Sequence, residues 1–280
     1  MKILVTGGAG FIGSNFVRHA LQEGHEVVST SIDDASLETS KLTNLNKRLG
    51  DIESQDLDGC DAIAHFAAYG VTPKPCNLGT AYEVNVVQSI NLLEMAKKCG
   101  IKRFVASGSF AEYGLSGLRY DKIPSYAPLE PTDTYAASKA AACIALTSYA
   151  RSNKMQIVYG RIFSAYGDGQ HHGNFWPSLR KAALAGDDFE MTSGEQIRDF
   201  LPVQEVARKF LVACTADGVE DGIPVVENVA SGTPVTLAKF AQRWWGEFGA
   251  TGKIKIGVVP YRENEVMRYI PDLSNQKVLI

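Results

Sequence analysis

The sequence predicts an α/β fold of the Rossmann type, in which a doubly wound parallel sheet is followed by a smaller α/β lobe. Short runs rich in β-branched residues alternate with helical stretches up to residue 160, a pattern typical of βαβ units. A glycine-rich loop separates the first run from the first helical stretch. Beyond Arg161, the polar connector Gly167–Gly173 leads into shorter and less regular elements. We therefore expect a large domain over residues 1–165 and a smaller lobe over residues 166–280.

The period of the apolar residues predicts the individual elements. Short apolar runs predict strands at Lys2–Thr6, Glu26–Ser31, Arg48–Gly50, Ala62–His65, Arg103–Ser107 and Gln156–Arg161. Apolar residues at three- and four-residue spacing predict helices at Phe11–Glu23, Tyr82–Cys99 and Thr132–Ser152. In the smaller lobe, the sequence predicts helices at Phe175–Ala185, Gln204–Ala216 and Leu237–Phe248 and strands at Pro224–Val229 and Lys253–Val258.

Composition excludes several classes of protein. A chain of 280 residues that is 45% hydrophobic can bury a large core. The net charge is −3 and the basic residues are scattered, so nucleic acid is not an expected partner. No apolar run approaches the roughly 20 residues that cross a bilayer, and no signal-peptide core precedes the glycine loop, so we expect a cytoplasmic protein. The five cysteines are widely spaced without a ligand pattern, so neither a disulfide framework nor a metal site is expected.

The opening loop predicts a dinucleotide site. Gly7, Gly10 and Gly13 follow a strand and open a helix, with Phe11 and Ile12 between the last two glycines. Glycine leaves the backbone N–H groups unhindered, so they can approach a pyrophosphate at the positive end of the helix. The second strand, where a carboxylate would bind both ribose hydroxyls, ends near Ser31, and Asp33 follows two residues later. Ser31 at the tip favours NADP and Asp33 would favour NAD; we lean slightly towards NADP.

Two further segments are candidates for the cofactor site. Asp51 and Ile52, after the third predicted strand, could hold the adenine edge, although a solvated turn is an alternative for the acid. The fourth strand ends at His65 and is followed by Phe66-Ala67-Ala68, whose small residues let the backbone approach a cofactor. We expect His65 to be structural, because no carboxylate or nucleophile accompanies it in the sequence.

Tyr135 and Lys139 predict proton transfer. A phenol and an ammonium four residues apart lie on one face of a helix. The cation can then favour tyrosinate over tyrosine, which makes the phenol usable as an acid or base near neutral pH. Ser107 and Ser109 close the fifth strand, where Ser109 could bind a carbonyl that also faces Tyr135.

These motifs resemble those of the extended short-chain dehydrogenase/reductase family, in particular its nucleotide-sugar epimerases, dehydratases and 4-ketoreductases. The resemblance covers nearly the whole chain, and it includes the glycine loop, Tyr82-Glu83-Val84-Asn85-Val86, Tyr135 to Lys139, Arg161 to Gly167 and Arg198-Asp199-Phe200. It implies hydride transfer between a nicotinamide and a sugar carbon. In that chemistry Tyr135 exchanges the proton, Ser109 orients the oxygen, and Lys139 holds the nicotinamide ribose.

The resemblance also implies how the substrate is held. Arg198 and Arg262 match arginines that grip the diphosphate of a sugar nucleotide, a role that suits the guanidinium fork. Ser164 stands where many epimerases carry an asparagine that contacts the substrate. The family resemblance further suggests a homodimer built from the helices of Tyr82 and Tyr135; those faces could equally pack on the sheet.

Departures from the family patterns narrow the activity. Dehydratases place an Asp-Glu pair directly after the equivalent of Ser109, whereas this chain has Phe110-Ala111, and Glu112 is one residue too far along to take the acid role. We therefore expect a 4-ketoreductase of a 4-keto-6-deoxy sugar nucleotide in surface polysaccharide biosynthesis. The alternative is a 4-epimerase with tightly held NAD. A dinucleotide-sensing protein without turnover is a third hypothesis, which the complete set of Ser109, Tyr135 and Lys139 disfavours.

Overall fold

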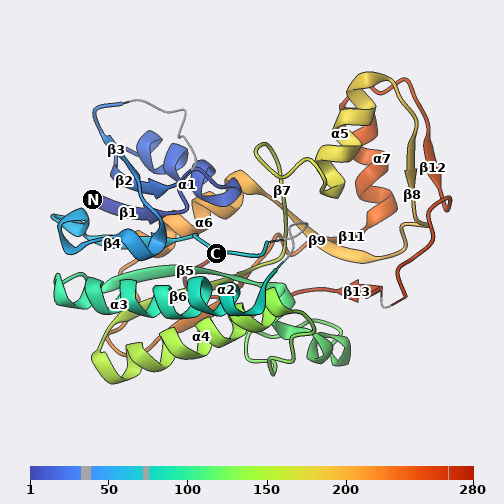
Figure 1. Ribbon diagram of the computed structural model, residues 1–280. Coiled ribbons are helices and arrows are strands. Elements are labelled where there is room, and N and C mark those ends of the chain that lie inside the picture. Colours follow the sequence, from blue (N-terminus) through green and yellow to red (C-terminus); the bar gives the residue numbers. More distant parts are fainter. Residues whose placement is uncertain (33–38, 72–75, 264) are drawn as a thin grey trace.

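The large domain is built on one sheet of seven strands in the order β10-β6-β5-β4-β1-β2-β3 (Figure 1). The computed structural model describes residues 1–32, 39–71, 76–263 and 265–280. Neighbouring strands of this sheet run parallel, and their order reverses between β1 and β4, so the predicted doubly wound sheet is confirmed. The strands are β1 (Lys2–Thr6), β2 (Glu26–Ser31), β3 (Leu42–Asn46), β4 (Ala62–His65), β5 (Arg103–Ser109), β6 (Gln156–Ile162) and β10 (Val225–Val229).

The predicted third strand, Arg48–Gly50, is wrong. The third strand is Leu42–Asn46, and Leu49–Asp51 forms a short 3-10 turn. β3 lies at the edge of the sheet and exposes the polar side chains at positions 43, 44 and 46. An edge strand of this composition lacks the continuous apolar run that marks strands buried on both faces.

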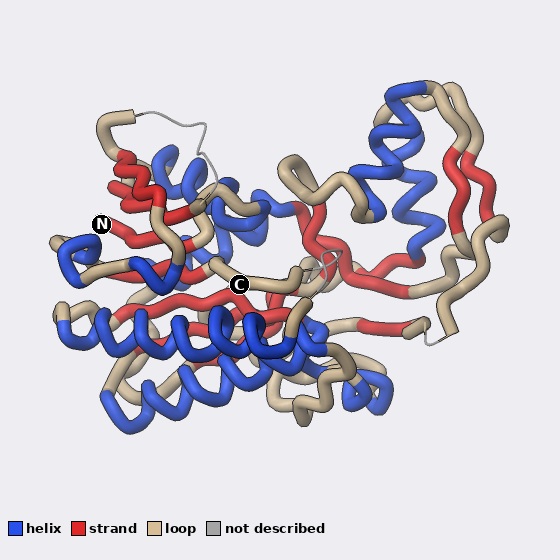
Figure 2. The backbone as a smooth tube through the Cα atoms, in the orientation of Figure 1, coloured by secondary structure: helices blue, strands red, loops and turns tan. Residues whose placement is uncertain are grey.

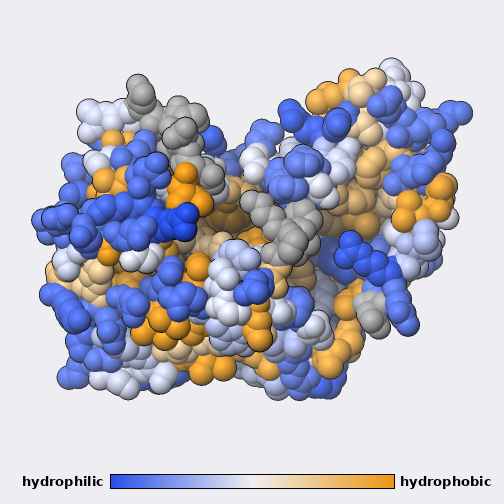
Figure 3. All heavy atoms as spheres, viewed as in Figure 1, coloured by the Kyte–Doolittle hydropathy of each residue, from blue (hydrophilic) through white to orange (hydrophobic). Residues whose placement is uncertain are grey.

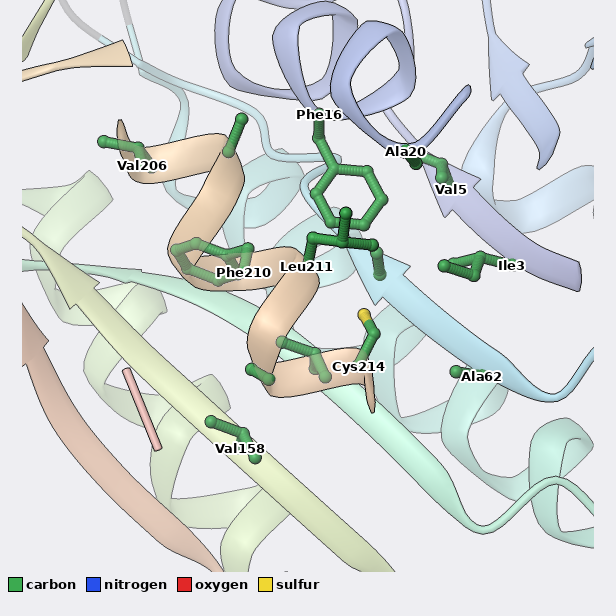
Figure 4. Close-up of a cluster of buried hydrophobic side chains, with 14 of the residues drawn as sticks. Ile3, Val5, Phe16, Ala20, Ala62, Val158, Val206, Phe210, Leu211 and Cys214 are labelled. Carbon is green, nitrogen blue, oxygen red and sulfur yellow. The ribbon is translucent and has the colours of Figure 1, made fainter. Parts of the chain in front are cut away.

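Helices cover both faces of the sheet. On one face α1 (Phe11–Gln22) packs beside α6 (Val203–Thr215), and their Phe16 and Phe210 side chains lie in the buried cluster of Figure 4. On the other face lie α3 (Ser89–Lys98) and α4 (Thr134–Asn153) (Figure 1). α3 is preceded by α2 (Leu78–Tyr82) and by a π-helical segment, Glu83–Gln88. The single helix predicted over Tyr82–Cys99 is therefore divided.

The smaller lobe contains α5 (Phe175–Ala185), α7 (Leu237–Glu247) and the paired strands β8 (Phe189–Met191) and β12 (Ile254–Ile256) (Figure 2). A second small sheet links this lobe to the large domain; its strands are β7 (Ser164–Tyr166), β9 (Ile197–Pro202), β11 (Pro234–Thr236) and β13 (Arg268–Tyr269). Phe200 of β9 stacks on Phe240 of α7, with 3.8 Å between the ring centroids. This aromatic contact anchors the strand that carries Arg198.

The chain returns from the smaller lobe to the large sheet. α6 packs on α1, and β10 adds a strand beside β6. The C-terminal segment then docks on β10, where the buried Glu227 carboxylate accepts backbone N–H groups from Lys277 at 2.6 Å and Leu279 at 2.7 Å. The boundary expected at residue 165 thus assigns to the lobe several elements that lie in the layers of the large sheet.

The surface is hollowed between the large domain and the smaller lobe (Figure 3). The strands of the second small sheet cross this region between the two bodies (Figure 2). Within the described ranges, no helix combines the length and apolar character that a membrane span requires. The same residues contain no cluster of His, Cys, Asp or Glu that could hold a metal ion.

Candidate active site

The glycine loop packs directly against the end of β4. Gly7 has a φ of +67°, and a Cβ added there would lie 2.8 Å from the backbone N of Ala67. A Cβ added at Gly13 would lie 2.1 Å from the carbonyl O of Gly7. The Gly10 N–H donates to that same carbonyl at 3.0 Å. Side chains are therefore excluded from this loop by its own backbone and by the strand behind it.

The N-terminus of α1 fits an anion. Gly10 is the capping residue and has no side chain that could accept a hydrogen bond from the first turn. The N–H groups of the first turn have no partner inside a helix, so they can bind a phosphate at the positive end of the dipole. Phe11 and Ile12 are half-buried beside this loop. The predicted residues Gly7, Gly10, Phe11, Ile12 and Gly13 therefore form a cradle that suits the pyrophosphate of a dinucleotide.

The segment after β4 forms the floor of this cradle. Ala67 donates its N–H to the Thr6 hydroxyl at 3.2 Å, and Ala68 follows at an intermediate depth. Phe66 turns into the core, where its ring lies 5.1 Å from that of Phe16. His65 is buried, with hydrogen bonds to Thr6 at 2.7 Å and to Ser89 at 2.9 Å, and burial lowers its pKa to about 3. His65 thus has the structural role that the sequence indicates, and Phe66 serves packing.

The residues predicted to bind the adenosine half of the cofactor come from two separate segments, the end of β2 and the turn at Leu49–Asp51. Ser31 ends β2 opposite Asn46 of β3, at the tip where a ribose would lie. Asp33 lies outside the described residues. Asp51 ends the 3-10 turn with an exposed side chain, whereas Ile52 is buried in the core beneath α3. Ser31 therefore lies at the tip of β2, and Asp51 lies at the surface.

Ser109 is fixed at the end of β5. Its Oγ accepts the Ala111 N–H at 3.2 Å and caps a 3-10 turn, η4 (Phe110–Tyr113). Ser107 lies two residues before Ser109, on the same face of the strand, and its hydroxyl donates to the His65 carbonyl at 3.3 Å. Ser109 therefore lies at the C-terminal end of β5, beside the segment that follows the neighbouring strand β4.

Tyr135 and Lys139 lie on successive turns at the start of α4. Asp133 caps this helix by accepting the Ala136 N–H at 2.8 Å, which sets where the helix begins. α4 packs on β5 and on η4, so both side chains are brought to the Ser109 end of the sheet. Lys139 is only 3% exposed, and its ammonium makes no hydrogen bond or ion pair with any described residue. A buried cation without a protein partner is expected where a ligand supplies the acceptor.

The electrostatics of Tyr135 correct one expectation. Burial raises the pKa of its phenol above the usual value, and the charges of Glu112 and Asp133 raise it further. Burial also lowers the pKa of Lys139. The predicted lowering of the phenol pKa by Lys139 is wrong for this arrangement, because the phenol is desolvated and its strongest charged neighbours are acids. The phenol is therefore held in its protonated form.

Asn85, from the Tyr82–Val86 segment of the family resemblance, joins two parts of the candidate site although the sequence assigned it no role. Its buried amide donates to the Ser138 hydroxyl at 2.8 Å and to the Tyr69 carbonyl at 3.0 Å. It thus ties the segment after β4 to the residue before Lys139. Asn85 lies in the π-helical segment, a feature often found at functional sites. A polar residue within an otherwise apolar helix face was the available signal.

The two candidate phosphate-binding arginines lie in β9, which contains Arg198, and in the segment before β13, which contains Arg262. The Arg198 guanidinium pairs with Glu265 at 3.2 Å and donates to the Val266 carbonyl. Glu265 in turn donates its backbone N–H to the carbonyl of Arg262, whose side chain is exposed. Both arginines therefore come from the same small region of the structure, as a shared ligand would require.

Ser164 begins β7 and lies opposite Phe200 of β9, two residues beyond Arg198. Asp199, the middle residue of the Arg-Asp-Phe motif, is buried and accepts the backbone N–H groups of Ser231 at 2.7 Å and Gly232 at 2.8 Å. In this motif Asp199 holds the backbone of a neighbouring loop and Phe200 packs on Phe240, while Arg198 is the candidate binding residue. Ser164 of β7 and Arg198 of β9 therefore lie on neighbouring strands of the linking sheet.

Comparison with known sequences gives a family match. The sequence profile described as the NAD dependent epimerase/dehydratase family matches residues 3–226. The chain is 28% identical over 257 residues to a UDP-glucose 4-epimerase of Corynebacterium glutamicum, covering 83% of this chain and 76% of that relative. It is 29% identical over 298 residues to a dTDP-glucose 4,6-dehydratase of Streptomyces niveus, covering 98% and 85% respectively.

Comparison with solved structures gives the same grouping. The fold is similar to MoeE5 in complex with UDP-glucuronic acid and NAD, with a TM-score of 0.84 at 25% identity over 98% of this chain and 90% of that one. It is also similar to the UDP-N-acetylglucosamine 4-epimerase of Methanobrevibacter ruminantium, with a TM-score of 0.87 at 24% identity over 99% and 91%. The latter likeness supports the fold alone.

Proposed function

Because the chain belongs to the NAD-dependent epimerase/dehydratase family, we propose that it is an oxidoreductase acting on a nucleoside-diphosphate sugar. Within that class, we propose reduction of the 4-keto group of a 4-keto-6-deoxy sugar, as a step in the biosynthesis of a surface polysaccharide. The protein would act in the cytoplasm, where such sugar nucleotides are made.

The pair Phe110-Ala111 is the observation that carries this proposal. The Phe110 ring stacks on Phe163 at 5.6 Å and meets the edge of Tyr269 at 5.3 Å, so it belongs to an aromatic cluster. Elimination of water needs an acid and a base near the sugar. Neither a phenyl ring nor a methyl group can supply them, and Glu112 is engaged with Arg161. This supports hydride and proton exchange over dehydration at the proposed site.

The proposed chemistry follows from the three reactive side chains. A nicotinamide held by the glycine loop and Lys139 would supply the hydride for C4 of the sugar. Tyr135 donates its proton to the carbonyl oxygen as that oxygen gains charge, which yields a hydroxyl group. Ser109 orients the oxygen with its hydroxyl dipole, and Lys139 holds the nicotinamide ribose.

Substrate and cofactor binding are proposed on the same basis. Arg198 and Arg262 would bind the diphosphate, which requires Arg198 to exchange its partner Glu265 for phosphate oxygens. Ser164 would contact the sugar from β7. The residue at the tip of β2 is Ser31, not a carboxylate that would bind both ribose hydroxyls, so we retain the slight preference for NADP over NAD.

We also propose a homodimer formed through the α2–α3 and α4 helices. These helices lie on the outer face of the sheet (Figure 1) and expose Tyr82, Val87 and Ile144 to 38%, 43% and 62%. Light scattering should give twice the mass of one chain. Replacement of Ile144 by Lys should shift that mass to one chain without lowering the helix content.

The activity is tested by cofactor consumption. Purified protein is incubated with dTDP-4-keto-6-deoxyglucose and either NADPH or NADH, and the loss of absorbance at the nicotinamide band is followed. We expect consumption equal to the amount of keto sugar added, faster with NADPH. Absence of consumption with both cofactors would refute the reductase.

A 4-epimerase is the second candidate, favoured by the names of several relatives. The Corynebacterium glutamicum relative is a UDP-glucose 4-epimerase, and an epimerase would use the same Ser109, Tyr135 and Lys139. It would hold NAD through purification and interconvert UDP-glucose and UDP-galactose without added cofactor. That result would replace the reductase proposal.

A further inference from the structure

Glu112 is a charged side chain enclosed behind the reactive site. It has no exposed surface, and its Oε2 accepts the Nε–H of Arg161 at 2.6 Å. Arg161 is itself only 3% exposed. An ion pair enclosed to this extent is rarely the most stable solution for a protein core, since desolvation opposes the attraction. The pair therefore indicates a role other than stability, such as holding neighbouring groups in place.

The second oxygen of Glu112 joins two elements that carry reactive residues. Oε1 accepts the backbone N–H of Ser109 at 2.7 Å. The same oxygen accepts the Tyr159 hydroxyl at 2.9 Å, and that hydroxyl also lies 3.0 Å from the carbonyl O of Lys139. One carboxylate thus contacts the end of β5 directly and the Lys139 turn of α4 through a single phenol.

The surrounding backbone is shaped around this pair. A Cβ added at Gly108 would lie 2.2 Å from a ring carbon of Tyr159 and 2.7 Å from Glu112 Oε1. The strand therefore needs glycine at the residue before Ser109 for the carboxylate and the phenol to reach each other. No other residue type would leave this gap.

The far side of the pair is fully engaged. Arg161 donates to the Ser125 carbonyl at 2.8 Å and to the Tyr113 hydroxyl at 3.1 Å. Tyr113 donates in turn to Asn228 of β10 at 2.5 Å. Because each partner is held by further hydrogen bonds, the Glu112 carboxylate has little freedom to move.

We propose that Glu112 is a positioning residue, which holds Ser109 at the end of β5 in fixed register with the Lys139 turn of α4. The inference rests on the proposed function, in which Ser109 orients the carbonyl and Lys139 holds the cofactor. Hydride transfer requires the reacting atoms within a few tenths of an ångström of their alignment, so loosening this register should lower the rate of the chemical step.

The test compares Glu112→Gln with a matched control, Glu227→Gln. Both residues are buried carboxylates that accept backbone N–H groups, but the hydrogen bonds of Glu227 go to the C-terminal segment at Lys277, Val278 and Leu279. The first readout is amide hydrogen exchange. Glu112→Gln should speed exchange at residues 107–113 and 135–143, whereas Glu227→Gln should speed it only near the C-terminus.

The second readout is turnover of dTDP-4-keto-6-deoxyglucose with NADPH. We expect Glu112→Gln to lower kcat by on the order of 10- to 100-fold, the range for a small misplacement of reacting groups, with KM nearly unchanged. Glu227→Gln should keep the wild-type kcat. Tyr135→Phe is included as a reference whose turnover should fall by about 10²- to 10⁴-fold.

The pH profile separates positioning from a general loss of stability. The titratable groups that act on the Tyr135 phenol are Glu112 from η4, Asp133 at the start of α4 and Cys76 before α2, and each raises its pKa. Removing the Glu112 charge should move the alkaline limb of kcat to lower pH. Glu227→Gln should leave that limb in place.

The outcomes distinguish the two claims. Wild-type exchange and wild-type kcat in folded Glu112→Gln would overturn the positioning role. Normal turnover in Tyr135→Phe would overturn the proposed function instead.

If the wild-type protein does not turn over the keto sugar, hydrogen exchange in Glu112→Gln is the deciding measurement. Unchanged protection at residues 135–143 would then overturn the tie between β5 and α4. If Glu112→Gln fails to fold, the double variant Glu112→Leu/Arg161→Met removes both buried charges and is judged by the same readouts.

Discussion

The two ends of the proposed site differ in how their side chains are held. At the reactive end, Ser109 and the Lys139 turn are joined through Glu112, which is fully buried and bonded to Arg161. At the phosphate end, Arg198 pairs with Glu265, and their side chains are 17% and 22% exposed respectively. Arg262 is exposed as well. A site of this kind combines preorganised chemistry with a binding region that can exchange partners. The reactive end should therefore tolerate change much less than the phosphate end.

The largest effect is expected at the centre of the reactive end. Tyr135→Phe removes the proton donor and leaves the ring that packs there. Turnover should fall by about 10²- to 10⁴-fold, the usual contribution of a positioned acid, while dinucleotide affinity measured by nicotinamide fluorescence stays within a few fold. Near wild-type turnover would show that the proton comes from another group.

At the phosphate end, the expected effect is on binding. Arg198→Ala should raise KM for the sugar nucleotide by about 10- to 100-fold, which corresponds to the loss of charged hydrogen bonds, with a much smaller change in kcat. Arg268→Ala, an exposed arginine on β13, is the control and should leave KM unchanged. A fall in kcat alone would contradict the division between the two ends.

Burial at the reactive end also predicts how stability depends on pH. His65 has a pKa lowered from 6.5 to about 3, so the folded protein binds no proton there while the unfolded chain does. Its contribution is fully present above pH 6.5 and is lost as the pH falls towards 3. Between pH 6.5 and 5 the loss should be on the order of 2 kcal/mol. Chemical unfolding of the wild type and of His65→Gln should show this slope only in the wild type; equal slopes would contradict it.

The smallest effect is expected in the lobe. Gly246 lies within α7, and a Cβ added there meets no atom within 4 Å. Gly246→Ala should stabilise the helix by about 0.5–1 kcal/mol without changing turnover. Gly108→Ala is the contrasting substitution at the reactive end, because its Cβ would clash with Tyr159. If the two glycine substitutions had similar effects on thermal unfolding, the comparison between the regions would fail.

Local sequence signals predicted the elements that are buried or capped. The first two strands, the fourth strand and α5 were predicted with their observed bounds, since continuous apolar runs and helical spacing mark them. β3 was missed because it is a polar edge strand, and β7, β9, β11 and β13 because short linking strands carry little periodicity. The grouping of Ser109, Tyr135 and Lys139 was predicted from the end of the fifth strand, the spacing on one helix and the family resemblance, and α4 does contact β5 and η4.

The supporting contacts could not be predicted in the same way. Glu112 reaches Arg161 and Tyr159, which lie 49 and 47 residues further along the chain. Asn85 reaches Ser138 across 53 residues. Such partners are set by how β5, β6 and α4 pack, and no local pattern contains that information. For the same reason the direction of the Tyr135 pKa shift depended on burial and on Glu112, which lies 23 residues earlier in the sequence.

The most direct test of the central claim is isotopic. Wild-type protein is incubated with dTDP-4-keto-6-deoxyglucose and NADPH that carries deuterium at C4 of the nicotinamide, and the product sugar is examined by mass spectrometry and NMR. Transfer of one deuterium to C4 of the sugar, with one NADP formed for each sugar reduced and none with Tyr135→Phe, is the predicted result. A sugar without deuterium, together with interconversion of UDP-glucose and UDP-galactose on NAD that remains bound, would contradict it.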